Sequence, residues 1–177
     1  RFMAKEVLPV VAAEGLARYA DVFCERGYFG PAESEDFLRA AQAAGLGVRV
    51  HAEQLTRSGG AQLAAKLKAC TADHLDKADD LDLAALKEAG TVACLVPGSN
   101  HFLGLAEMPP ARRILDAGVP VALATDFNPG TCPCWNMQEI LAIAVSRMKM
   151  SPEEVLVSAT VNGAWAAGLG KTHGTLE

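Results

Sequence analysis

The sequence lacks a basic patch, a long apolar run and an abundance of aromatic side chains. Its 177 residues carry a net charge of −5, and no stretch concentrates Lys and Arg, so a nucleic-acid partner is not expected. No apolar run approaches the roughly 20 residues of a membrane-spanning helix, and the N-terminus has no signal-peptide pattern. We therefore expect a cytoplasmic protein without a membrane partner.

Cysteine is too sparse and too scattered for a disulfide framework. The five cysteines are Cys24, Cys70, Cys94, Cys132 and Cys134, an odd number that fits a reducing compartment. Only the last two lie close together, and their spacing is neither that of a zinc ribbon nor that of a redox motif. We interpret this pair as small residues near a turn.

Strands and helices alternate along the chain. Apolar runs that end in polar residues predict strands at 21–25, 46–51, 70–74, 91–96 and 119–124. Gly, Pro and acidic residues mark helices at 31–44, 60–69, 80–89 and 110–117, with two more at 136–149 and 152–169. Residues 4–19 are interpreted as a helix broken at Pro9, and residues 99–108 as a loop. Because no hairpin signal separates the strands, we expect a parallel sheet with right-handed crossovers.

Two α/β architectures fit this alternation: an open doubly wound sheet, or part of a (β/α)8 TIM barrel. The Gly-rich phosphate-binding fingerprint of nucleotide-binding sheets is absent. Polar residues instead follow several different strands, which is typical of the C-terminal face of a barrel. A closed barrel needs eight strands and about 250 residues. We therefore predict that residues 1–177 form one partial barrel domain and, since the chain starts at Arg1 inside an apparent helix, that it is a fragment of a longer protein.

The last predicted strand ends in a carboxylate. Residues 119–124 carry no charge, and Thr125-Asp126 follows before a turn at Asn128-Pro-Gly130. Burying a carboxylate there is costly unless a metal, a basic side chain or backbone donors compensate it. His51 ends the second strand in the same way, and Asp73-His74 ends the third. We expect these strand ends to meet at one rim of the sheet.

Each of these residues has an ordinary explanation when taken alone. A single histidine at a strand end is usually a satisfied polar residue, and Asp126 could cap a helix or pair with an arginine. Together, His51, His74 and Asp126 would form a nitrogen and oxygen ligand set suited to zinc or ferrous iron, which activates water by lowering its pKa to about 7. The chain has no His-x-His pair, so a complete ligand set is not visible in it.

Several motifs together resemble the imidazolonepropionases of histidine degradation, within the amidohydrolase superfamily. They occur in the order expected for that family, at residues 21–25, 51–55, 59–60, 71–74, 90–98 and 124–130. The resemblance implies a metal-dependent (β/α)8 barrel with a small β-sandwich, of which this chain would cover about strands four to eight. The strand-one His-x-His pair, the Arg, Tyr and His that hold the propanoate, and most of the sandwich are absent, which we interpret as truncation.

The resemblance also implies a reaction and residue roles. The expected reaction opens the ring amide of 4-imidazolone-5-propanoate to N-formimino-L-glutamate, with Zn2+ or iron (Fe2+ or Fe3+) as cofactor and a homodimer as the assembly. His51 and Asp126 would be metal ligands, with Asp126 also accepting the proton of the attacking water, and His74 would polarise or orient the attacked group. Four residues would contact substrate or product: Gln54, Asn128, Gly130 and Thr131. Without the resemblance, Asn128, Gly130 and Thr131 would be interpreted as a turn.

Two alternatives remain open. The first is another amidohydrolase, such as a cyclic-amide hydrolase or a nucleobase deaminase. The second is a non-catalytic α/β binding domain in which the polar strand ends serve only as turns and caps. The second alternative predicts no metal, and no effect of Asp126→Ala beyond stability.

Overall fold

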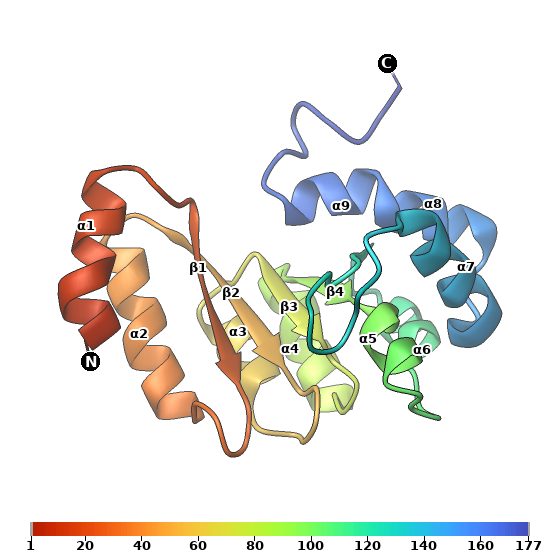
Figure 1. Cartoon of the computed structure of the whole chain (residues 1–177), viewed down its shortest axis with the longest axis horizontal. Coiled ribbons are helices and arrows are strands. Elements are labelled where there is room, and N and C mark those ends of the chain that lie inside the picture. The colour runs from red at the N-terminus through yellow and green to blue at the C-terminus, as the bar shows by residue number, and fades with distance from the viewer. Residues whose placement is uncertain (1, 177) are drawn as a thin grey trace.

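A five-stranded parallel sheet forms the centre of the computed structural model, which describes residues 2–176 (Figure 1). The strands are β1 (Tyr19–Cys24), β2 (Gly47–Ala52), β3 (Thr71–His74), β4 (Val92–Leu95) and β5 (Val121–Leu123). Their order in the sheet follows their order in the chain, and every neighbouring pair is parallel. The predicted parallel sheet is confirmed, and each strand lies within two residues of its predicted range.

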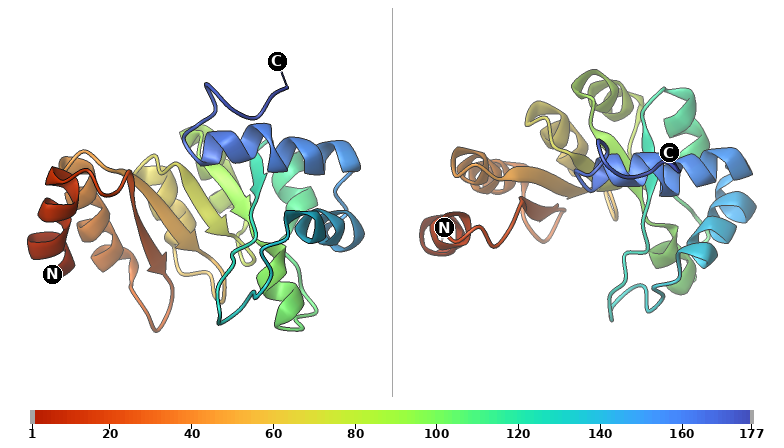
Figure 2. Two further views of the ribbon diagram at one scale, coloured as in Figure 1. Left: turned by 45° about the horizontal axis from the view of Figure 1, so that its top comes forward. Right: turned by 90° about the horizontal axis from the view of Figure 1, so that it is seen from above.

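Helices connect the strands and follow the last of them. Their bounds are η1, a π-helix (Met3–Val7), α1 (Leu8–Ala13), α2 (Pro31–Ala43), α3 (Gly60–Lys66), α4 (Asp80–Ala89), α5 (Pro97–Phe102), α6 (Ala111–Asp116), α7 (Met137–Met148), α8 (Pro152–Ala159) and α9 (Val161–Ala166). Seen from above, α2, α3, α4 and α6 form an arc along one face of the sheet (Figure 2). The terminal helix α9 packs against β4 and β5.

The strand register separates an apolar face from a polar face. Val50 and Ala72 are paired in register and are fully buried against the helices. One residue further along, Phe23, His51, Asp73 and Cys94 form the next row across β1 to β4. Because successive side chains point to opposite faces of a strand, this polar row lies on the face away from the helical arc.

The N-terminal helix differs from its prediction. Pro9 does not break it: η1 runs directly into α1, in which Pro9 occupies the first turn. A proline there removes no α-helical hydrogen bond within α1 itself, and the wider π turn before it is closed by the Leu8 N–H donating to the Met3 carbonyl. The helix also ends earlier than expected, at Ala13.

Two later predictions were wrong in detail. Residues 99–102, predicted as the start of a loop, belong to α5. This helix begins at Pro97, whose fixed φ is favourable at a helix start. The predicted helix at 152–169 is divided into α8 and α9 at Thr160, whose backbone leaves the helical region at φ −112° and ψ −82°. The Thr160 hydroxyl donates to the Leu156 carbonyl and satisfies that end of α8.

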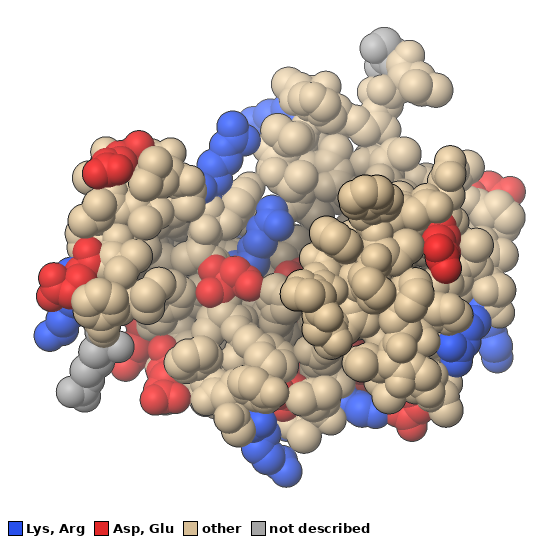
Figure 3. All heavy atoms as spheres, in the orientation of Figure 1, with Lys and Arg blue, Asp and Glu red and all other residues tan. Residues whose placement is uncertain are grey.

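Within residues 2–176, no helix combines the length and apolar character needed to cross a bilayer. On the face drawn in Figure 3, acidic and basic side chains are interspersed around a hollow between the N-terminal strands and the C-terminal helices.

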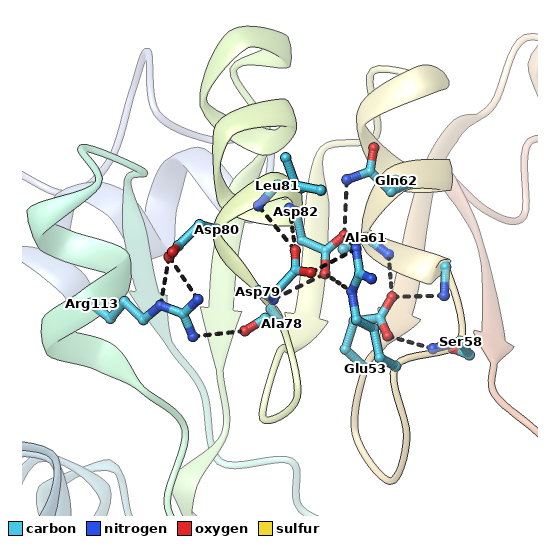
Figure 4. Close-up of polar contacts among 12 residues, drawn as sticks. Glu53, Ser58, Ala61, Gln62, Ala78, Asp79, Asp80, Leu81, Asp82 and Arg113 are labelled. Carbon is cyan, nitrogen blue, oxygen red and sulfur yellow. Dashed lines mark hydrogen bonds and ion pairs between the residues drawn. The ribbon is translucent and has the colours of Figure 1, made fainter.

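The start of α4 is held by a buried carboxylate. Asp82 accepts two hydrogen bonds from the Arg57 guanidinium, at 2.8 and 3.1 Å, and one from the Gln62 amide at 2.9 Å (Figure 4). It also accepts the Asp79 N–H, while Asp79 accepts the Asp82 N–H in return, which is a reciprocal capping box. Burial would raise the pKa of Asp82, but the hydrogen bonds from Arg57 and Asp79 outweigh it and lower that pKa.

We expect Asp82→Asn to lower the free energy of unfolding by about 1–3 kcal/mol at neutral pH, because a fully buried acceptor of an arginine is lost. The folded-state pKa of Asp82 is depressed, so its contribution is present above the unfolded pKa and disappears as pH falls through the folded value. Urea unfolding at several pH values measures both effects. The exposed Asp116→Asn is the control, and a loss that persists unchanged in acid would contradict the assignment.

We expect Gly98→Ala to destabilise the protein by about 1–3 kcal/mol through overpacking. A Cβ at Gly98 would lie 2.7 Å from the Cys132 sulfur and 3.2 Å from the Thr125 carbonyl oxygen. Gly30→Ala is the matched control, because no atom lies within 4 Å of its added Cβ. Equal melting temperatures for the two variants would show that the contact around Gly98 is not tight.

Candidate metal centre

Three side chains meet at the carboxyl end of the sheet. His51 lies on β2, His74 is the last residue of β3, and Asp126 follows β5. One ligand-type atom from each lies within 4.8 Å of the other two, and the two imidazole centroids are 5.4 Å apart. The structure therefore brings together the three residues that the sequence pattern singled out.

The backbone is unusual at these strand ends. His74 and Asp126 have positive φ angles of 75° and 53°, and Glu53, two residues after His51, has a φ of 56°. Residues other than glycine seldom adopt this left-handed conformation, which costs of order 1 kcal/mol or more and persists where the surrounding structure enforces it. Such backbone outliers cluster at functional sites.

A second group of side chains adjoins the first and shares His51 with it. The His51 Nδ1 lies 2.8 Å from an Asp21 carboxylate oxygen and 3.7 Å from one of Asp73. Ligand-type atoms of these three residues also lie within 4.8 Å of one another. The sequence interpretation missed Asp21 and gave Asp73 no role of its own. The alternation of side chains along a strand could have identified Asp21. It lies two residues before Phe23 on β1 and therefore on the same strand face, and Phe23 is paired in register with His51.

These contacts shift the ionisation of the cluster. Burial lowers the pKa of His51, but Asp21, Asp73 and Asp126 outweigh that effect and raise it to about 9. Burial and the charge of His51 lower the pKa of His74 to about 3. Burial raises the pKa of Asp73 to about 6 and also raises that of Asp126. A neutral His74 keeps a lone pair free on one ring nitrogen. The carboxylates around His51 outnumber the positive charges beside them, and this excess negative charge favours the binding of a cation.

The donor set fits a divalent metal ion. Two imidazoles and one carboxylate are ligands that zinc and ferrous iron accept. The His74 Nδ1 and the Asp73 Oδ1 are buried without a hydrogen-bond partner among the residues that the structure describes. Because buried polar atoms rarely lack partners in proteins, this shortage fits a site that binds a further group.

A cavity of about 280 Å3 adjoins the cluster. Its lining includes His51, His74 and Asp126 together with Ala166 of α9. Arg49 also lines it, donates to the Ala166 carbonyl at 2.5 Å and stacks over the Tyr19 ring. A larger groove of about 560 Å3 lies elsewhere, around α6 and the end of α7, and contains none of the three converging residues. We therefore assign the candidate site to the smaller cavity, where the titratable groups meet.

The loop after β5 is a tight turn beside Asp126. Asn128 accepts the N–H groups of Gly130 and Thr131 at 2.8 Å each and donates to the Asp126 carbonyl and the Thr131 hydroxyl. The Thr131 hydroxyl also donates to the Asp126 carboxylate at 3.4 Å. This turn therefore fixes Asp126, and Asn128 is largely satisfied within it. Gln54 lies half-buried on the loop after β2.

The chain is similar in sequence to several curated proteins. It is 48% identical over 176 residues to the imidazolonepropionase of Symbiobacterium thermophilum, a match that covers 99% of this chain and 41% of that protein. The imidazolonepropionase of Alkaliphilus metalliredigens is 44% identical over 172 residues, covering 97% of this chain and 41% of that protein. The chain thus spans about two fifths of the length of the curated relatives it matches.

Solved structures share the fold at lower identity. The Aspergillus niger ochratoxinase has a TM-score of 0.74 and 22% identity over 98% of this chain and 46% of that one. A zinc-bound adenosine deaminase from Xanthomonas campestris has a TM-score of 0.67 and 21% identity over 85% of this chain and 39% of that one. A model of the amidohydrolase family matches residues 25–177. The parallel sheet is thus part of an amidohydrolase barrel, and the chain belongs to the amidohydrolase family.

Proposed function

We propose that this chain forms about strands four to eight of a metal-dependent hydrolase barrel. The enzyme would open the ring amide of 4-imidazolone-5-propanoate to give N-formimino-L-glutamate. The observation that carries this proposal is the convergence of His51, His74 and Asp126, in a chain 42–48% identical to proteins named imidazolonepropionase. The partner of the site is then a small molecule.

His51 and Asp126 would hold the metal ion, zinc or iron, together with ligands from outside this chain. When bound, such an ion lowers the pKa of a water molecule to about 7 and polarises a carbonyl group. Asp126 accepts the proton of the attacking water and returns it to the leaving ring nitrogen. Its pKa, raised by burial, suits a group that both accepts and returns a proton.

His74 would orient the attacked carbonyl. It is 3% exposed and neutral at pH 7, so it can donate an N–H to a substrate oxygen without competing for the water proton. Gln54 would donate to a substrate carbonyl from the loop after β2. The turn formed by Asn128, Gly130 and Thr131 would line the site on the side of Asp126, where its hydrogen bonds fix that carboxylate.

Another amidohydrolase reaction is the second candidate, favoured by the similarity of the fold to an adenosine deaminase. Turnover of imidazolone propanoate, hydantoin-type cyclic amides and adenosine by the full-length protein separates the two. A binding domain without catalysis predicts no turnover of any of them and no bound metal.

We expect Asp126→Ala and His51→Ala to lose the stoichiometric zinc or iron of the full-length protein, because each removes one proposed ligand. Elemental analysis of the purified protein measures the metal. Asp116→Ala, an exposed carboxylate paired with Arg112 on α6, is the control and keeps the metal. Full metal content in both site variants would place the ion elsewhere.

We expect Asp126→Asn to lower kcat for imidazolone opening by about 10²- to 10⁴-fold, the range typical of lost general acid–base catalysis. His74→Gln is expected to lower kcat as well while the metal is retained, since His74 acts here on the carbonyl. Loss of the imidazolone absorbance follows the reaction. A kcat within twofold of wild type for Asp126→Asn would contradict the proton-transfer role.

A further inference from the structure

We propose that Glu25 and Glu53 are positioning residues for the substrate-binding side chain of Gln54. They hold the loop between β2 and α3, residues 54–59, in one conformation next to the strand end that carries His51. This inference rests on the proposed function and adds to it two residues that do not touch the reacting atoms. It also implies that the loop does not act as a mobile lid.

Glu25 anchors the first half of the loop. It follows the last residue of β1 and is 1% exposed. Its carboxylate accepts the N–H groups of Leu55 and Thr56, at 2.8 and 3.2 Å, and the Thr56 hydroxyl also donates to it. Two consecutive loop amides are thereby fixed to the end of a neighbouring strand.

Glu53 anchors the second half. It is fully buried, two residues after His51 on the same chain segment. Its carboxylate accepts the N–H groups of Ser58, Gly59 and Ala61 at 2.6, 3.0 and 3.0 Å (Figure 4). The Ser58 hydroxyl donates to the Cys24 carbonyl at 2.8 Å, which ties this part of the loop to β1 as well.

The hydrogen bonds to Glu25 and Glu53 hold positions 55, 56, 58 and 59 of the loop. The Arg57 side chain donates to Asp82, so every position from 55 to 59 is held. Gln54 is the exception. Among the described residues, the groups that donate hydrogen bonds to Glu25 and Glu53 from the loop lie at 55–61. The glutamine side chains that donate to protein acceptors within this part of the chain are those of Gln42 and Gln62, so the Gln54 amide is not used in this way. A half-buried amide left unused beside an otherwise fixed loop is available to a ligand.

Loop stability alone does not require this arrangement. Burying a carboxylate is costly unless several donors compensate it, and apolar side chains of similar volume often stabilise a fold as well or better. Two such carboxylates brace one short loop at the strand ends that carry His51. Rigid support of a binding group within a fraction of an ångström is what productive substrate geometry demands.

The test is a set of double-mutant cycles in the full-length protein. We expect Glu25→Gln and Glu53→Gln to raise KM for imidazolone propanoate roughly two- to tenfold, to speed amide exchange at residues 55–59 and to leave metal content unchanged. Because each acts through Gln54, each double variant with Gln54→Ala should have the KM of Gln54→Ala alone. Thr56→Val, which removes one contact to Glu25, serves if Glu25→Gln does not fold.

Glu35→Gln is the control, because that carboxylate pairs with Arg39 of α2 and Lys66 of α3 and accepts none of the hydrogen bonds from the loop. Effects on KM that multiply with that of Gln54→Ala, or unchanged amide exchange in the loop, would overturn the positioning role. A wild-type protein that binds metal but does not turn over imidazolone would instead overturn the proposed function. The two failures are therefore distinguishable.

Discussion

The candidate site depends on the parallel, in-register pairing of β1 to β5. Parallel pairing places the carboxyl ends of all five strands at one edge, and the register sets His51 beside Phe23 and Asp73. A shift of one residue in β2 would exchange the faces of Val50 and His51. The apolar row that packs on the helical arc and the polar row at the candidate site are thus two consequences of the same register, so core burial specifies the position of the polar side chains at that site.

Charge balance is the second constraint. Asp21, Asp73 and Asp126 lie around His51 and raise its pKa, and burial together with the charge of His51 keeps His74 neutral. Asp73 and Asp126 are partly buried and Asp21 is exposed, and a positive charge nearby stabilises carboxylates that lie this close together. In the proposed site, a divalent ion held by His51 and Asp126 would supply that charge, and its attraction to the carboxylates would contribute to the free energy of metal binding. The neighbouring turn at Asn128 and the loop braced by Glu25 then hold the groups around it.

The sequence predicted the strands and the convergence of His51, His74 and Asp126, because each feature is local: an apolar run and a polar residue at its end. It did not predict the contact of Asp21 with His51, since that contact depends on register between strands. Glu25 was missed for the same reason, because the amides that it binds lie about 30 residues further along the chain. The helix at Pro97 was missed because Pro-Gly is ambiguous, being compatible both with a loop and with a helix start.

The measurement that tests this account most directly is the crystal structure of the full-length protein, with anomalous diffraction collected at the zinc and iron absorption edges. The account predicts one anomalous peak bonded to a His51 ring nitrogen and an Asp126 oxygen, each at about 2.0–2.2 Å. It also predicts His74 and Gln54 beside that peak. A peak between Asp21 and Asp73 instead, or none at any edge, would contradict the central claim that the strand ends of this sheet form a hydrolytic metal centre.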